Sequence, residues 1–315
     1  PRRLYHPSVT WLRKIRRGDD MSYSIEPVPG PLGARVKGLN MAKPVSDQTM
    51  QALLEVWYDR QVLIFEDQSL SNQQHIDFSR RIGPLEVHPS GKYVLKDYPE
   101  LLLLTNKQDD AGNYISLRDG GSVWHSDLSY MKEPSLGSLL YAIDVPQAGG
   151  DTEWANMYLA YEKLPKELKD RIAGLKAIHQ FDQNDNPRLG PPADMTPEQL
   201  EGSIWEKKTP EIKARTPDAV HPVVRVHPEN ERKALFVNRR FTIRIEDMDA
   251  DEGEALLLEL FEHCEHQDNV YRHRWAKGDL VMWDNRCTIH LACGGVPDDQ
   301  IRTMQRTTVR GESSA

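Results

Sequence analysis

A histidine and an aspartate lie two positions apart in VWHSDLSY, residues 123–130. In an extended strand, residues i and i+2 point to the same face, so His125 and Asp127 would present an imidazole and a carboxylate side by side. Two histidines and one carboxylate are the ligands that bind non-haem Fe(II) while leaving positions open for oxygen and a cosubstrate. His290, at the end of the strand-like run in VMWDNRCTIH, is our candidate for the third ligand.

Two arginines and a threonine are candidates for binding the carboxylates of such a cosubstrate. Arg302 and Arg306 are four residues apart in the last predicted strand, which places both guanidinium groups on one face. A guanidinium matches a carboxylate with two parallel hydrogen bonds. Thr152 follows the glycine turn in AGGDTEW and could donate its hydroxyl to the same carboxylate. The alternatives are a surface arginine pair, a turn threonine, and a histidine hydrogen-bonded to a neighbouring aspartate.

The composition of the 315-residue chain argues against several classes of protein. Its formal net charge of -8 lacks the basic footprint of a nucleic-acid-binding protein. No apolar run reaches the roughly 20 residues that cross a membrane. Three irregularly spaced cysteines indicate neither a disulfide framework nor a zinc site, and a reducing cytoplasm is the simplest location. We expect a cytoplasmic homo-oligomer, dimer or tetramer, with a small-molecule substrate and no nucleic-acid or membrane partner.

Hydrophobic periodicity predicts the elements that must position these residues. It predicts helices over 46–61, 71–83, 166–181 and 249–267, the first two beginning at serine caps. Strands are expected over 62–67, 101–106 and 137–145, and later in HPVVRVH, KALFVN, VYRHRWA, DLVMWDN and MQRTTVRG. No βαβ rhythm is present. We therefore predict a mainly β fold with helical insertions (α+β), an antiparallel sandwich or jelly roll flanked by helices.

Two segments fall outside this pattern. Residues 1–21 are basic and are predicted to be a flexible N-terminal extension, with an amphipathic anchor as the alternative. A single domain would then cover residues 22–312. Residues 182–218 are polar, rich in proline and without periodicity, which is typical of a lid or a disordered loop. We expect this segment to be a lid inserted into the domain.

Four motifs together resemble the Fe(II)/2-oxoglutarate-dependent taurine and 2,4-dichlorophenoxyacetate dioxygenase (TauD/TfdA) family. They are WHSD, AGGDTEWANMYLAYEKLP, YRHRWAKGDLVMWDNRCTIH and RTMQRTTVRG, and the resemblance runs over residues 22–311. It implies a double-stranded β-helix (jelly roll) flanked by helices, with Fe(II), 2-oxoglutarate and O2 as cofactor and cosubstrates. The residues that match the family's iron ligands are His125, Asp127 and His290. Thr152 and Arg302 match the residues that bind the distal carboxylate of 2-oxoglutarate.

The resemblance also implies an anionic substrate. Arg306 matches the arginine that holds the substrate sulfonate in taurine dioxygenase, and His88 matches a histidine that assists it. At His88 a bound anion would favour an imidazolium, so we expect this ring to be charged. Gly91 and Gly121 stand where that enzyme has polar side chains near the substrate amine, which argues against taurine itself. The expected apolar lining consists of Leu128, Tyr130, Phe236 and Trp283. The expected reaction hydroxylates a C–H bond of a sulfonate, alkyl sulfate or aryloxyalkanoate, with release of succinate and CO2.

Three other functions remain open at this point. The same cofactors could act on an amino-acid or fatty-acid carboxylate, by hydroxylation or desaturation. A zinc hydrolase could use the same three ligands with a metal-bound water, but it would need a general base. A non-catalytic jelly-roll binding protein would keep the fold without needing a complete metal site.

Overall fold

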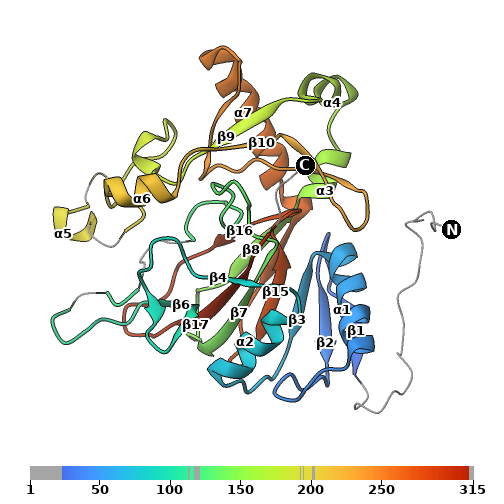
Figure 1. The fold of residues 1–315 in the computed structure, drawn as a ribbon, viewed down its shortest axis with the longest axis vertical. Helices are drawn as coiled ribbons and strands as arrows, with labels where there is room; N and C mark the ends of the chain where they lie inside the picture. Colours follow the sequence, from blue (N-terminus) through green and yellow to red (C-terminus); the bar gives the residue numbers. More distant parts are fainter. Residues whose placement is uncertain are drawn as a thin grey trace.

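The computed structural model describes residues 23–112, 114–116, 121–191, 193, 195–200 and 203–311. The predicted N-terminal extension, residues 1–21, lies outside the described residues. The described part consists mainly of β-strands, with helices packed around them (Figure 1). This arrangement confirms the predicted mainly β fold with helical insertions.

Nine of the described strands form the main sheet. Their hydrogen-bonded order is β1 (Ser24–Pro27), β2 (Ala34–Lys37), β3 (Val62–Phe65), β15 (Leu280–Asp284), β7 (Gly137–Asp144), β17 (Thr303–Val309), β6 (Tyr98–Thr105) and β5 (Val94–Leu95), and β4 (Leu85–Glu86) pairs with β17. Only β2 and β3 are parallel neighbours among these described strands. The C-terminal strands β15 and β17 therefore flank β7 from the middle of the chain.

A second sheet packs against the main one and completes a sandwich. It contains β14 (Val270–His273), β8 (Thr152–Asn156) and β16 (Thr288–Ala292). Trp154 on β8 packs against Trp283 on β15, with ring centroids 5.6 Å apart. The buried side chains between the sheets form one continuous core, which includes Val62, Ile64 and Leu140.

Strand β3 shows why the predicted strands are apolar without interruption. Successive side chains of a strand point to opposite faces. Val62 and Ile64 belong to the core between the sheets, whereas Leu63 and Phe65 pack toward α1 (Asp47–Arg60) and α2 (Asn72–Arg80). Both faces of β3 are therefore buried, as a short continuous apolar run predicts. The serine caps of both helices are present, and α2 has the complete capping box.

Further elements cover the outer face of the second sheet. They are α3 (Met157–Glu162), α7 (Ala250–Glu265), η2 (Gln267–Asn269) and the hairpin of β11 (Val224–Val226) and β12 (Lys233–Leu235). The predicted helix over 249–267 is confirmed as α7. The segment 182–218 contains η1 (Gln183–Asp185), α5 (Pro197–Leu200) and α6 (Pro210–Arg215) among its described residues. No helix of the described residues is both long and apolar enough to be a membrane span.

The predicted helix over 166–181 is wrong in its second half. Helix α4 (Lys166–Ile172) ends early, and Gly174 has a φ of 78°, in the left-handed region that favours glycine. The chain then continues as β9 (Lys176–His179), which lies beside β10 (Ala219–Pro222) (Figure 1). On its other side β9 pairs with β13 (Thr242–Ile245). Pairing of β9 with a strand on each side outweighed the local helical periodicity. A pattern within one segment does not reveal such pairing, because the partner strands lie elsewhere in the chain.

Candidate metal centre and adjoining cavity

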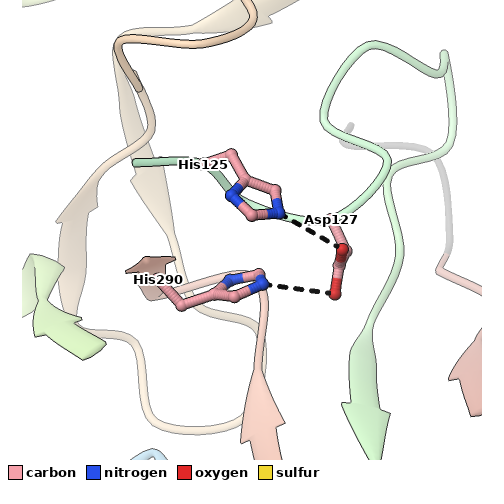
Figure 2. A group of neighbouring side chains, drawn as sticks. All are labelled: His125, Asp127 and His290. Carbon is pink, nitrogen blue, oxygen red and sulfur yellow. Dashed lines mark ion pairs between the residues drawn. The ribbon is translucent and has the colours of Figure 1, made fainter. Parts of the chain in front are cut away.

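His125 and His290 are brought together by their main chains. The His125 N–H donates to the His290 carbonyl at 3.1 Å, and the His290 N–H donates to the His125 carbonyl at 2.7 Å. His290 lies on β16, and the pairing of β16 with β8 holds that strand in place. The two imidazole rings therefore stand beside each other, with centroids 4.1 Å apart (Figure 2).

Asp127 reaches the histidines from a turn and not from the predicted strand. Strand-like pairing stops at His125, because Leu128 has a φ of 55° and the Met131 N–H donates to the Leu128 carbonyl at 2.9 Å. The turn still places the carboxylate against both rings. Asp127 Oδ1 lies 3.8 Å from His125 Nε2, and Asp127 Oδ2 lies 3.8 Å from His290 Nε2 (Figure 2).

The three side chains fit one metal ion. Two ligand atoms at about 2.1 Å from a common ion can be no more than about 4.2 Å apart, and the Nε2 of each histidine lies 3.8 Å from one oxygen of Asp127. One ligand atom from each of the three residues lies within 4.8 Å of the other two. All three side chains are buried. His125 Nδ1 donates to the Val123 carbonyl at 2.8 Å, which leaves the lone pair of Nε2 for a metal. Histidines that bind a metal through one ring nitrogen commonly donate a hydrogen bond from the other, as His125 does here.

The charges at the site also suit a cation. Burial lowers the pKa of His125 and lowers that of His290 to about 4, so both imidazoles are neutral at pH 7. Burial by itself would raise the pKa of Asp127, but the charge of Arg306, together with the hydrogen bond from Ser138, offsets this and holds it below its usual range. Arg306 Nη1 donates to Asp127 Oδ1 at 2.5 Å. Two neutral imidazoles and one carboxylate are the protonation states that metal binding requires.

A buried hydrogen-bond network holds the Asp127 carboxylate. Ser138 Oγ donates to Asp127 Oδ2 at 2.7 Å, and Asn285 Nδ2 donates to Ser138 Oγ at 3.0 Å. Asn285 Oδ1 accepts from the Asp127 N–H at 3.3 Å and from Trp283 Nε1 at 2.9 Å. Neither Ser138 nor Asn285 was predicted from the sequence. The only signal for Asn285 was a polar pair, DN, directly after an apolar strand.

A cavity of about 830 Å³ adjoins the metal site. The predicted site residues that line it are His88, His125, Asp127, Leu128, Tyr130, Thr152, Trp283, His290, Arg302 and Arg306. The structure therefore brings together all but one of the residues proposed from the sequence.

Phe236 is the exception and needs a correction. It does not line the cavity; it stacks on His179 with ring centroids 5.7 Å apart and packs edge-on against His221 at 5.4 Å. Phe241 lines the cavity in its place, with its ring 4.8 Å from that of Tyr130. The sequence offered two phenylalanines on either side of one turn, and only the path of that turn decides which of them reaches the site.

Arg302 and Thr152 form one end of the cavity. Arg302 Nε donates to the Gly150 carbonyl at 3.0 Å, and burial lowers the pKa of this arginine to about 10. Gly150 has a φ of 73°, and a Cβ there would approach Arg302 Cδ to 2.8 Å, so glycine leaves room for the guanidinium. Trp275 Nε1 donates to Thr152 Oγ1 at 2.9 Å. The Thr152 hydroxyl therefore keeps its own hydrogen to donate to a ligand.

His88 lies near Arg306, and its charge state differs from the expected imidazolium. Burial, with Arg306 as the next cause, lowers the pKa of His88 to about 4, so the ring is neutral at pH 7. His88 Nδ1 lies 2.8 Å from Ser90 Oγ and 3.3 Å from the Ser90 nitrogen, and in the tautomer in which Nδ1 accepts from that N–H the ring hydrogen is on Nε2. His88 can therefore donate one neutral hydrogen bond to an anion.

A protein-family model and two known relatives match nearly the whole chain. The family model "Taurine catabolism dioxygenase TauD, TfdA family" matches residues 24–308. The chain is 33% identical over 281 residues to an alpha-ketoglutarate-dependent 2,4-dichlorophenoxyacetate dioxygenase of Cupriavidus pinatubonensis, covering 86% of this chain and 92% of that protein. It is 30% identical to an alpha-ketoglutarate-dependent sulfate ester dioxygenase of Pseudomonas putida, covering 93% of this chain and 91% of that one.

Solved structures share the fold. The structure of AAD-2 in complex with Mn(II) and N-oxalylglycine has a TM-score of 0.75 at 29% identity, covering 94% of this chain and 100% of that chain. A taurine dioxygenase from Burkholderia xenovorans has a TM-score of 0.74 at 28% identity, covering 93% of this chain and 90% of that one. This likeness confirms the jelly-roll fold expected from the sequence.

Removing the Ser138 hydroxyl should weaken metal binding. We expect Ser138→Ala to lower the affinity for Mn(II) about 10- to 100-fold, the usual range for partners of metal ligands, because Asp127 Oδ2 loses the donor that orients it. Free Mn(II) can be followed by electron paramagnetic resonance. Ser79→Ala is a matched control, because Ser79 is equally buried but bonds to the His75 carbonyl and Thr307. Equal Mn(II) affinities in the two variants would refute the orienting role.

Proposed function

This chain belongs to the TauD, TfdA family of taurine catabolism dioxygenases, and on that basis we propose that it oxidises a small organic anion. It is a 2-oxoglutarate-dependent dioxygenase that uses Fe(II) and O2 and releases succinate and CO2. The observation that carries the proposal is the buried group of His125, Asp127 and His290 at the wall of a cavity that also contains buried arginines.

Arg302 and Thr152 are proposed to hold the distal carboxylate of 2-oxoglutarate. Among the described residues, no carboxylate forms an ion pair with the half-buried Arg302 guanidinium, and only its Nε forms a hydrogen bond, to a carbonyl. A cation that has lost part of its hydration is costly unless it is paired, so an anionic ligand would stabilise this arrangement. The planar guanidinium and the free hydroxyl hydrogen of Thr152 together match a carboxylate.

The remaining cavity residues are proposed to hold the substrate. Arg306 Nε is buried and has no hydrogen-bond partner among the described residues, so it has a donor to offer in addition to its pair with Asp127. Arg306 and His88 would bind the anionic head group. Leu128, Tyr130 and Trp283 are buried and would pack on the apolar tail.

The metal and the protein would have different roles in the reaction. Fe(II) supplies the O2 chemistry that couples loss of CO2 from 2-oxoglutarate to oxidation of a substrate C–H bond. The chain's own residues hold two anions in fixed positions next to the metal ligands and exclude water from between them. Such positioning converts a collision of several molecules into a reaction within one complex.

The substrates named for the relatives support a small organic anion. The names of two relatives specify a chlorophenoxyacetate and a sulfate ester. We therefore propose a sulfonate, an alkyl sulfate or an aryloxyalkanoate for this chain. An amino-acid or fatty-acid carboxylate, hydroxylated or desaturated with the same cofactors, is the second candidate, because the same donors would bind its carboxylate.

The other two functions considered from the sequence have less support. A zinc hydrolase would give no role to the half-buried Arg302 beside Thr152. A non-catalytic binding protein would not need two neutral imidazoles and a carboxylate oriented by Ser138.

We also propose that residues 182–218 form a lid within a single domain over 22–312. Ile204, Lys208 and Ile212 from this segment line the cavity, and the Lys208 ammonium lies 5.3 Å from the Phe181 ring centroid. The segment thus contributes to the wall of the cavity although its helices are short.

Three expectations about the cellular setting stay predictions from the sequence. They are a cytoplasmic location, a homo-oligomeric state, and a lack of nucleic-acid and membrane partners. Cys264, Cys287 and Cys293 are free thiols in the structure, as a reducing compartment would leave them.

The proposed activity can be tested by succinate release. We expect the purified enzyme with Fe(II), O2 and 2-oxoglutarate to release succinate faster when an alkanesulfonate, an alkyl sulfate or an aryloxyalkanoate is added. Taurine should stimulate release less than these anions. A His290→Ala variant, which lacks one metal ligand, serves as the blank. If no member of such a panel stimulates succinate release above the blank, the proposed function is wrong.

Arg302 should matter for 2-oxoglutarate far more than for the substrate. Truncating one partner of a buried, hydrogen-bonded charge pair costs roughly 2–5 kcal/mol, so Arg302→Ala should raise the KM for 2-oxoglutarate about 30-fold or more. Arg302→Lys should recover only part of this, because lysine lacks the planar fork. Arg272→Ala is the control, since Arg272 is more exposed and pairs with Asp151. If the KM for 2-oxoglutarate and the KM for the substrate rose equally, Arg306 would be the residue that binds the cosubstrate.

The lid should become ordered when ligands bind. We expect amide hydrogens in 182–218 to exchange quickly in the free protein, because the short helices there bury few apolar side chains. Adding Mn(II), N-oxalylglycine and a substrate anion should slow that exchange, while the amides of β7 serve as the internal reference. Slow exchange without ligands, or exchange that ligands leave unchanged, would rule out a lid.

A further inference from the structure

Asn106 directly follows β6 and bonds to Arg302, which directly precedes β17. The Asn106 N–H donates to the Arg302 carbonyl at 3.3 Å, and Asn106 Oδ1 accepts from the Arg302 N–H at 2.9 Å. Asn106 Nδ2 donates to the Gln300 carbonyl at 2.8 Å. Because an N–H can only donate and a carbonyl can only accept, these two partners fix the orientation of the Asn106 amide. One side chain therefore binds main-chain groups on both sides of Ile301.

The pairing of β17 shows why these bonds matter for Arg302. Between β17 and β7 the register is irregular at the start of β17, next to Thr303. On its other side, Thr303 pairs with Thr105 in step with the rest of β6, and the two Oγ1 atoms lie 3.0 Å apart. Asn106 follows Thr105 and extends this regular pairing by one residue. Since successive side chains of a strand point to opposite faces, a slip of one residue would turn Arg302 away from the cavity.

The Arg302 side chain is placed by neutral contacts. Among the described residues, Asp151 pairs with another arginine, and Asp298, which lines the same cavity, forms no hydrogen bond with Arg302. The guanidinium itself is bonded only through Nε, to the Gly150 carbonyl at 3.0 Å. No carboxylate of the described chain therefore fixes this cation. Its position depends on the Gly150 carbonyl and on the main chain of Arg302, which Asn106 holds.

We propose that Asn106 is a positioning residue that holds Arg302 where its guanidinium can bind the distal carboxylate of 2-oxoglutarate. This inference rests on the proposed function and deepens it for the cosubstrate end of the cavity. Asn106 also lines the cavity, but its amide oxygen and nitrogen are bonded to the main chain, so it acts through Arg302. Without these bonds the main chain at Arg302 would be freer, and ordering the guanidinium on binding would cost conformational entropy.

The test measures binding of N-oxalylglycine, which carries the two carboxylates of 2-oxoglutarate, and binding of Mn(II). N-oxalylglycine is titrated calorimetrically into protein loaded with Mn(II), and Mn(II) binding is followed by electron paramagnetic resonance. The variants are Asn106→Ala, Arg302→Ala and the double variant. Asn230→Ala is the matched control, because Asn230 Nδ2 donates to the Tyr58 carbonyl at 2.8 Å and its Oδ1 accepts from the Arg232 N–H at 3.1 Å. Asn230 makes the same kinds of bond but does not line the cavity.

We expect Asn106→Ala to raise the dissociation constant of N-oxalylglycine about 10-fold, which corresponds to weakening one charge-assisted hydrogen bond. The dissociation constant of Mn(II) should stay unchanged, because Asn106 bonds to none of the metal ligands. Adding Asn106→Ala to Arg302→Ala should cause no further loss, since two residues that act through one contact are not additive. Asn230→Ala should bind both ligands like the wild-type protein. If Asn106→Ala fails to fold, Asn106→Ser should show the same pattern with a smaller rise.

Several results would overturn the proposal. They are unchanged N-oxalylglycine binding in Asn106→Ala or in Arg302→Ala, an equal loss of Mn(II) affinity, a further loss in the double variant, and an equal loss in Asn230→Ala. The absence of N-oxalylglycine binding by the wild-type protein would overturn it as well. In each case, succinate release from 2-oxoglutarate by the wild-type enzyme would leave the proposed function standing. Absence of any stimulated release would instead remove the proposed function itself.

Discussion

The reciprocal main-chain hydrogen bonds between His125 and His290 are the contact on which the site depends. They join a turn from the middle of the chain to β16 near its end. In the same sheet His290 pairs with Trp154, and Ala292 pairs with Thr152 on β8. The metal ligands and the residue proposed for the cosubstrate therefore belong to one hydrogen-bonded framework. The distance between the two ends of the cavity is set by strand register, which a bound ligand cannot easily change.

Buried charge is the second constraint on this protein. Arg306 is buried and Arg302 is half-buried in a chain whose formal net charge is -8. Arg306 is stabilised by Asp127, and Arg302 by a carbonyl and by the ligand that we propose. Burying these cations would weaken the fold if nothing offset their desolvation. A cavity built for two anions explains why the fold retains them.

The periodicity of the sequence was sufficient to predict most of the fold. The apolar run of β3 and the serine caps of α1 and α2 gave elements that the structure confirms. Such signals are local, because burial on one or both faces requires apolar side chains at particular spacings. The segment 166–181 shows the limit. The segment forms a helix as far as Ile172, as its apolar spacing predicts. Beyond that point it forms β9, because β10 and β13 pair with it on both sides.

The sequence by itself determined which chemical groups are available: an HxD pair, a distant histidine, and two arginines after it. It also determined the family, because those motifs occur together and in order. Only the tertiary structure decided that Arg306 contacts Asp127 while Arg302 lies beside Gly150, and that Phe241 faces the cavity instead of Phe236. The roles of Ser138 and Asn285 likewise depend on neighbours far away in the chain. The physical reason is that a side chain's contacts follow from strand pairing and turn path, and no local spacing of residues encodes either of them.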